Sequence, residues 1–112
     1  MIEDLKKGPD YAKIGMIASH LGIVRGNSLN GKTVTGMEVS FDYDKLDQIN
    51  HNIKGMDGIV DVLIDVTEGP LAVGDEVMAV VVGGDTREHV FPALIAAVNR
   101  IKSEASTKRE IF

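Results

Sequence analysis

The sequence predicts an α+β fold with a largely antiparallel sheet and two main helices, in the order strand, strand, helix, strand, strand, helix. Three observations support this prediction. Four stretches are apolar or alternate apolar with polar residues, two others repeat apolar residues with a helical period, and Gly, Pro, Asn and Asp separate them. With 112 residues and no internal repeat or linker, we expect one domain over residues 1–112.

The first part of the chain is expected to hold two strands. Met1–Lys7 fits a short helical turn, and Ile14–Arg25 is mostly apolar with small residues interspersed, as in a closely packed strand. After a loop at Gly26–Lys32, Val34–Phe41 alternates apolar and polar residues, which predicts a half-buried strand paired with the first in a hairpin. A lone histidine within a strand, here His20, is more often a core or edge residue than a ligand.

A helix and a third strand follow. Either Asp42 or Asp44 can cap the helix, whose apolar residues fall on one face, and Gly55 ends it. Ile59–Val66 alternates apolar residues with aspartate over most of its length, which predicts a strand. Turn-forming residues at positions 68–70 and 73–75 then lead into the fourth strand.

The last stretch, Glu76–Phe112, carries the fourth strand and the second main helix. A run of valines predicts a buried strand, and Asp85 and Glu88 stand three residues apart, in the relation of a capping box. Pro92 either kinks this helix or marks the start of its regular part. At about 100° per residue, the following residues share one apolar face: Phe91, Leu94, Ile95, Val98 and Ile101.

Two cations, Arg87 and Lys102, project from that same face by this count. Each alone has an ordinary explanation, because a long cationic side chain can lie on apolar surface with its charge in water. A lysine near a helix C-terminus is also favoured by the helix dipole. Together with the glycines before the helix and Lys108-Arg109 after it, the two cations indicate a pocket for an anion. We expect Lys102 to be enclosed at this pocket.

Composition excludes several classes of function. The chain has no cysteine, so disulfides, thiolate metal sites and cysteine nucleophiles are ruled out. A net charge of −5 argues against general nucleic-acid binding, and the absence of a long apolar run argues against a membrane span. The sequence contains no nucleotide-binding loop and no zinc-ligand spacing, and we expect no cofactor and no metal. Its charged first residues do not resemble a signal peptide, so a cytoplasmic location is expected.

Several short segments occur in a recognisable order and spacing. They are Gly22-Ile23-Val24-Arg25, Gly69–Glu76, Thr86–Phe91, Asn99–Lys102 and Lys108-Arg109-Glu110. With them the chain resembles the large, catalytic subunit of molybdopterin synthase (MoaE type) over roughly Gly15 to Glu110. The resemblance implies an α/β hammerhead-like fold and a homodimer. It also implies a small ubiquitin-like sulfur carrier at each end, which gives a heterotetramer.

The resemblance also implies a sulfurtransferase of molybdenum- or tungsten-cofactor biosynthesis. In that family the carrier's C-terminal Gly-Gly thiocarboxylate enters a pocket of the large subunit, and its sulfur passes to a cyclic pyranopterin monophosphate. Two such transfers form the dithiolene of molybdopterin, which later binds the metal.

Residue by residue, Lys102 matches the family lysine regarded as most important for catalysis. Lys108 matches the second family lysine if one residue is deleted between them, and Arg109 takes that place without the gap. Arg25 and Arg87 match arginines that bind anionic groups. Thr86 stands beside Arg87 where the family has histidine.

The chain also departs from the family pattern in the tail. Ser106-Thr107 replaces a segment that contains proline and tryptophan. Two hypotheses follow from the sequence. The chain is either a sulfurtransferase that uses Lys102, or a non-catalytic binding or assembly protein that keeps the anion pocket of the same fold.

Overall fold

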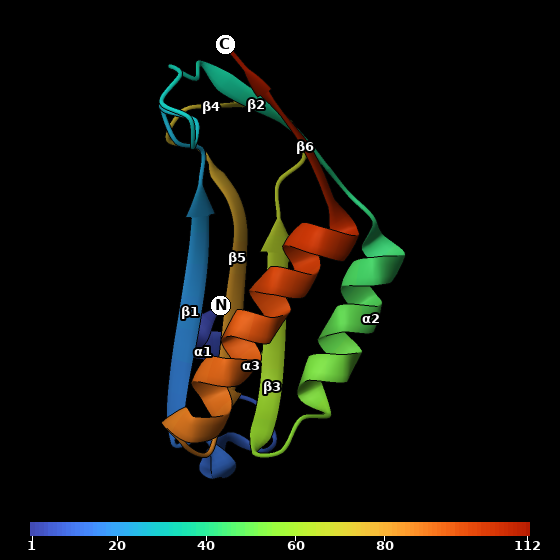
Figure 1. Cartoon of the computed structure of the whole chain (residues 1–112). Helices are drawn as coiled ribbons and strands as arrows, with labels where there is room; N and C mark the ends of the chain where they lie inside the picture. Colours follow the sequence, from blue (N-terminus) through green and yellow to red (C-terminus); the bar gives the residue numbers. More distant parts are fainter.

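The computed structural model describes residues 1–112 and contains two antiparallel sheets of three strands each (Figure 1). The expected α+β class is confirmed. The helices are α1 (Ile2–Lys6), α2 (Tyr43–Lys54) and α3 (Arg87–Arg100). The strands are β1 (Met16–Ile23), β2 (Gly36–Phe41), β3 (Ile59–Val66), β4 (Gly69–Ala72), β5 (Glu76–Gly84) and β6 (Ser106–Ile111). The molecule measures 47 × 23 × 23 Å because the smaller sheet extends beyond the end of the larger one.

The larger sheet has the strand order β1-β5-β3. Its central strand β5 has a continuous apolar sequence because both of its faces are covered: Val80 and Val82 are buried on one face, and Val81 is buried on the other. Helices α2 and α3 cover one face, and α1 lies behind the other, where Leu5 is buried against Gly83 (Figure 1). Burial of each such valine or leucine contributes about 1.5–3 kcal/mol. No helix has the length and apolar character needed to cross a bilayer.

The smaller sheet has the order β4-β2-β6, and it corrects the expected hairpin. β1 pairs with β5, whereas β2 pairs with β4 and β6, so the loop between β1 and β2 carries the chain from one sheet to the other. The alternation of apolar and polar residues within each strand was visible in the sequence, but the strand with which each one pairs was not. The sequence also missed β4 and β6. Proline in β4 is tolerated because β4 is an edge strand.

The starts of the two main helices differ in how well the sequence predicted them. Asp42 caps α2, and its Oδ1 atom accepts a hydrogen bond from the backbone N–H of Lys45 at 3.1 Å. The capping box predicted for α3 is wrong, because Thr86 is the residue that precedes the helix and its side chain makes no cap bond. Of the two alternatives left open for Pro92, a start of the regular helix at that residue is wrong, since α3 runs through Pro92 from its first residue, Arg87.

The core-facing side of α3 differs from the predicted one. Phe91 and Ile95 are 49% and 60% exposed, whereas Ala93 and Ala97 are fully buried. The small alanines allow α3 to approach β1 and β5 closely, and this moves the two large side chains outward. Val98 and Ile101 of the predicted face are buried as expected, so the prediction is wrong for Phe91 and Ile95 but not for the whole face.

Candidate functional site

A cleft lies where the two sheets meet, and it has two connected parts. The inner recess, of about 90 Å³, is lined by Gly22, Ile23, Met37, Val39, Phe41, Val77, Met78, Lys102, Ser106 and Lys108. The outer hollow, of about 670 Å³, shares five of these residues and adds His20, Leu21, Arg25, Ser28, Leu29, Asn30, Glu110 and Phe112. The outer volume suits a ligand of the size of a cofactor or metabolite. The cleft is therefore the candidate functional site.

Strand pairing places Lys108 in the cleft and Arg109 outside it. On β6, Lys108 lies opposite Val39 of β2, whose side chain lines the inner recess. Because side chains alternate along a strand, Arg109 points to the opposite face of the smaller sheet. The structure therefore brings Lys108, and not Arg109, next to Lys102.

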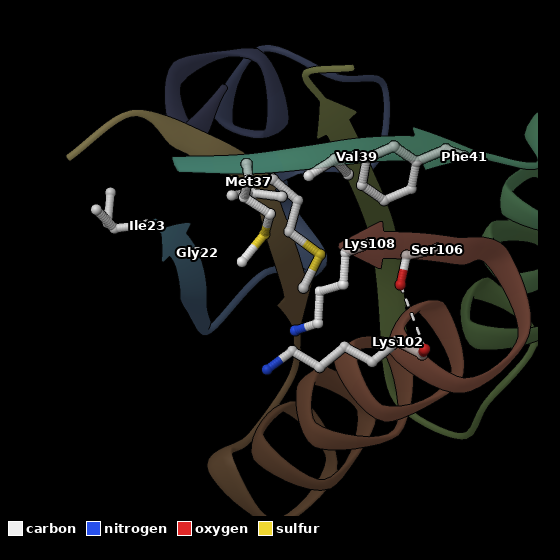
Figure 2. Close-up of a pocket in the computed structure, with 10 residues that line it drawn as sticks. Gly22, Ile23, Met37, Val39, Phe41, Lys102, Ser106 and Lys108 are labelled. Carbon is white, nitrogen blue, oxygen red and sulfur yellow. Dashed lines mark hydrogen bonds between the residues drawn. The ribbon is translucent and has the colours of Figure 1, made fainter. Parts of the chain in front are cut away.

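A π-helical turn at Ile101–Ala105 presents Lys102 to the cleft. Ile101 and Ala105 are buried and fix this turn to the core, so the side chain of Lys102 projects outward. The hydroxyl of Ser106 donates a hydrogen bond to the backbone carbonyl of Lys102 at 3.3 Å and closes the turn. Figure 2 shows the side chains of Lys102 and Lys108 reaching the same opening from the two elements. Turns of this kind occur often at functional sites.

The surroundings of Lys102 differ from those predicted. Lys102 lines both parts of the cleft, but it is exposed and not enclosed. The predicted apolar neighbours Phe91 and Ile95 are on the solvent side of α3. Lys102 lies within the π-helical turn, where a count at 100° per residue does not apply.

The cleft concentrates positive charge. Arg25 lines the outer hollow together with the two lysines, and none of the three lies within salt-bridge distance of a carboxylate. One carboxylate, that of Glu110, also lines the hollow. Unpaired cations that converge on a concave surface are suited to binding phosphate or carboxylate groups. No group of three or more His, Asp or Glu side chains is placed to share a metal ion.

Arg87 and Thr86 lie apart from the cleft. They stand at the start of α3, about 22 Å along the helix axis from Lys102 at a rise of 1.5 Å per residue. The side chain of Arg87 is 78% exposed and lies 3.5 Å from a carboxylate oxygen of Glu88. The prediction that Arg87 and Lys102 share one face and one pocket is therefore wrong for a single copy of the chain.

Ser106 and His20 are among the cleft residues that the sequence did not predict as site residues. Burial, and next the positive charge of Lys102, lower the pKa of His20 below its ordinary value. The Nε2 atom of His20 is buried and has no hydrogen-bond partner. Alternation along β1 puts His20 on the same face as Gly22, and that spacing was the available signal. What the sequence could not show was that this face meets Lys102.

Comparisons with known proteins agree with the fold. The family model described as MoaE protein matches residues 2–104. No curated protein matches the chain in sequence.

Three solved structures illustrate the likeness. Molybdopterin synthase from Staphylococcus aureus is 25% identical with a TM-score of 0.77, over 89% of this chain and 76% of that one. The molybdopterin cofactor biosynthesis protein E from Burkholderia multivorans is 24% identical with a TM-score of 0.77, over 99% and 73%. A complex of subunits 1 and 2 of molybdopterin-converting factor from Helicobacter pylori contains a chain with 16% identity and a TM-score of 0.72, over 99% and 80%.

Proposed function

The chain belongs to the MoaE family of molybdenum-cofactor biosynthesis, and from this premise we propose that it is the sulfur-transferring subunit of a molybdopterin synthase. Its substrates are a cyclic pyranopterin monophosphate and the C-terminal thiocarboxylate of a small carrier. The observation that supports this function best is the convergence of Lys102, Lys108 and Arg25 on one cleft without salt-bridge partners. Both substrates are anionic, and this cleft is where the chain offers unpaired positive charge on a concave surface.

The two parts of the cleft suit the two substrates. The inner recess is narrow and mostly apolar, which fits an extended Gly-Gly tail that has no side chains. The outer hollow is wider and more polar, which fits the pterin rings and their phosphate. In this arrangement the thiocarboxylate and the pterin meet at Lys102 and Lys108, because these two lysines line both parts.

The cations take different roles in this proposal. Lys102 is the candidate catalytic residue, because a lysine amine serves as an acid, a base or a nucleophile toward a carbonyl group. Lys108 and Arg25 hold the anionic groups, with each charged hydrogen bond contributing about 1.5–3 kcal/mol. Arginine suits phosphate in particular, since its planar guanidinium donates two parallel hydrogen bonds.

The proposed partners are a ubiquitin-like sulfur carrier and a second copy of the chain. The Helicobacter pylori structure is a complex of two different subunits, which supports a small-subunit partner. Phe91 and Ile95 form an exposed apolar stripe on α3, which supports a homodimer contact there. Arg87 stands one turn before Phe91 on this stripe. Its anion-binding role is therefore assigned to the cleft of the second copy, with Thr86 beside it.

A second candidate function is a non-catalytic binding or assembly protein. The observation that favours it is the exposure of Lys102, together with Thr86 in place of the family histidine. Such a protein would bind the same anions in the same cleft without forming product.

Product formation distinguishes the two functions. The purified protein is mixed with a thiocarboxylated carrier and cyclic pyranopterin monophosphate, and molybdopterin is measured by mass spectrometry. The proposed function requires repeated turnover. Tight binding of both substrates without product would establish the non-catalytic function instead.

A further inference from the structure

His20 presents a polar atom without a partner in the wall of the cleft. The residue lies on β1 opposite Val80 of β5, and it lines the outer hollow. Its Nε2 atom is buried and makes no hydrogen bond within the protein. Buried polar atoms are nearly always paired, so an unpaired one in the wall of a cleft indicates a group that a ligand satisfies.

Gly22 keeps the space beside this atom open. A Cβ atom at position 22 would lie 3.7 Å from Nε2 of His20 and 3.4 Å from Cγ of Met78. A side chain larger than alanine would therefore fill the space next to the imidazole. Gly22 lines both parts of the cleft, so His20 stands where the inner recess and the outer hollow meet.

The charges around His20 favour a neutral imidazole. Its pKa is lowered first by burial and then by Lys102, and the other charged residues of the hollow are Arg25, Lys108 and Glu110. Its neighbour on β5 is uncharged. A neutral imidazole carries one N–H group and one lone pair. In the tautomer with the N–H group on Nδ1, the Nε2 atom carries the lone pair and is a hydrogen-bond acceptor.

We propose that Nε2 of His20 accepts a hydrogen bond from the pyranopterin bound in the outer hollow. The inference rests on the proposed function and deepens it, because it names the residue that recognises the ring system and not the phosphate. A pterin carries N–H donors on its rings, whereas inorganic phosphate at neutral pH is bound chiefly by cations. Arg25 and Lys108 bind the phosphate group, and His20 accepts a hydrogen bond from a ring N–H group.

Two substitutions and two ligands test this assignment by calorimetry. His20→Phe keeps a flat ring but has no acceptor, and it should weaken the binding of cyclic pyranopterin monophosphate about five- to tenfold. His20→Gln keeps a neutral acceptor and should restore most of the affinity. Neither change should alter the binding of inorganic phosphate. The matched control is His51→Gln on the exposed side of α2, which should bind both ligands as the wild type does.

Three results would overturn the inference. The first is pterin binding by His20→Phe that equals wild-type binding in a protein that forms molybdopterin, which would leave the proposed function intact. The second is an equal loss of pterin and phosphate binding, which would show that His20 affects the structure or the charge of the whole cleft and does not recognise the pterin ring. The third is a wild-type protein that neither binds the pterin nor forms product, which would remove both the inference and the proposed function. Thermal unfolding of each variant identifies any loss of fold.

Discussion

Gly22→Val is expected to preserve the fold while it blocks the cleft. A Cβ atom at this position makes only ordinary van der Waals contacts, the nearest at 3.4 Å to Cγ of Met78. Gly22 also has no positive φ angle, so a branched residue fits its backbone. Glycine within a strand costs about 0.5–1 kcal/mol relative to alanine, and valine favours strands. The melting temperature of the variant should therefore equal or exceed that of the wild type.

The two methyl groups of the introduced valine enter the place where the inner recess and the outer hollow meet. Forcing extra methyl groups into an occupied space costs about 1–3 kcal/mol. If the carrier tail must pass this point, that cost becomes a loss of about 5- to 150-fold in kcat/KM for the carrier. The assay is the initial rate of molybdopterin formation over a range of carrier concentrations.

The matched control is Ser19→Val on the same strand. Ser19 is exposed and lies on the opposite face of β1, so its substitution should change neither the rate nor the fold. A folded Gly22→Val protein with wild-type kcat/KM would refute the assignment of the cleft as the path of the tail.

Three further outcomes are expected. Phe91→Asp on the exposed stripe of α3 should convert a dimer to a monomer in sedimentation at micromolar concentration, and a wild-type protein that is already monomeric would contradict this. Lys108→Ala should weaken binding of the pterin phosphate by about 1.5–3 kcal/mol, whereas Arg109→Ala, on the other face of β6, should leave calorimetric binding unchanged. His89 lies 2.7 Å from Asp85, which raises the pKa of His89, while His89 lowers the pKa of Asp85. The stabilisation from His89 is complete below its unfolded pKa of about 6.5 and is lost as pH rises through the raised folded value. The stabilisation from Asp85 is lost as pH falls through the lowered pKa of its folded state. His89→Gln should therefore reduce the free energy of unfolding more at pH 5.5 than at pH 9, and an equal loss at both would contradict this linkage.

Local patterns in the sequence predicted the individual elements well. The alternation in β2 and β3, the valine run of β5 and the aspartate cap of α2 each depend on neighbouring residues, which a sequence displays directly. The pairing of strands depends on residues far apart along the chain. The sequence therefore suggested a β1–β2 hairpin, although the two strands belong to different sheets.

The site was predicted in part for the same reason. The helical pattern and the charges after it identified Lys102 and Lys108, the family resemblance identified Arg25, and the fold brings these three to one cleft. Arg87 was placed with Lys102 by a helical count, but the length of α3 separates them. His20 was judged to be a core or edge residue, because only the folded structure, in which α3 packs on β1, shows that Lys102 lies near it.

If Lys102 is catalytic, this cleft performs sulfur transfer; if it is not, the cleft only binds the anionic ligands. Lys102→Ala is compared with the wild type in single-turnover formation of molybdopterin, with carrier and pterin affinities measured on the same samples. An interaction made only in the transition state affects the rate and leaves binding nearly unchanged. We expect Lys102→Ala to reduce the rate at least about 100-fold and to keep both affinities within about threefold of the wild type. A variant that retains the wild-type rate, or that loses rate only because it no longer binds its substrates, would show that Lys102 is not catalytic.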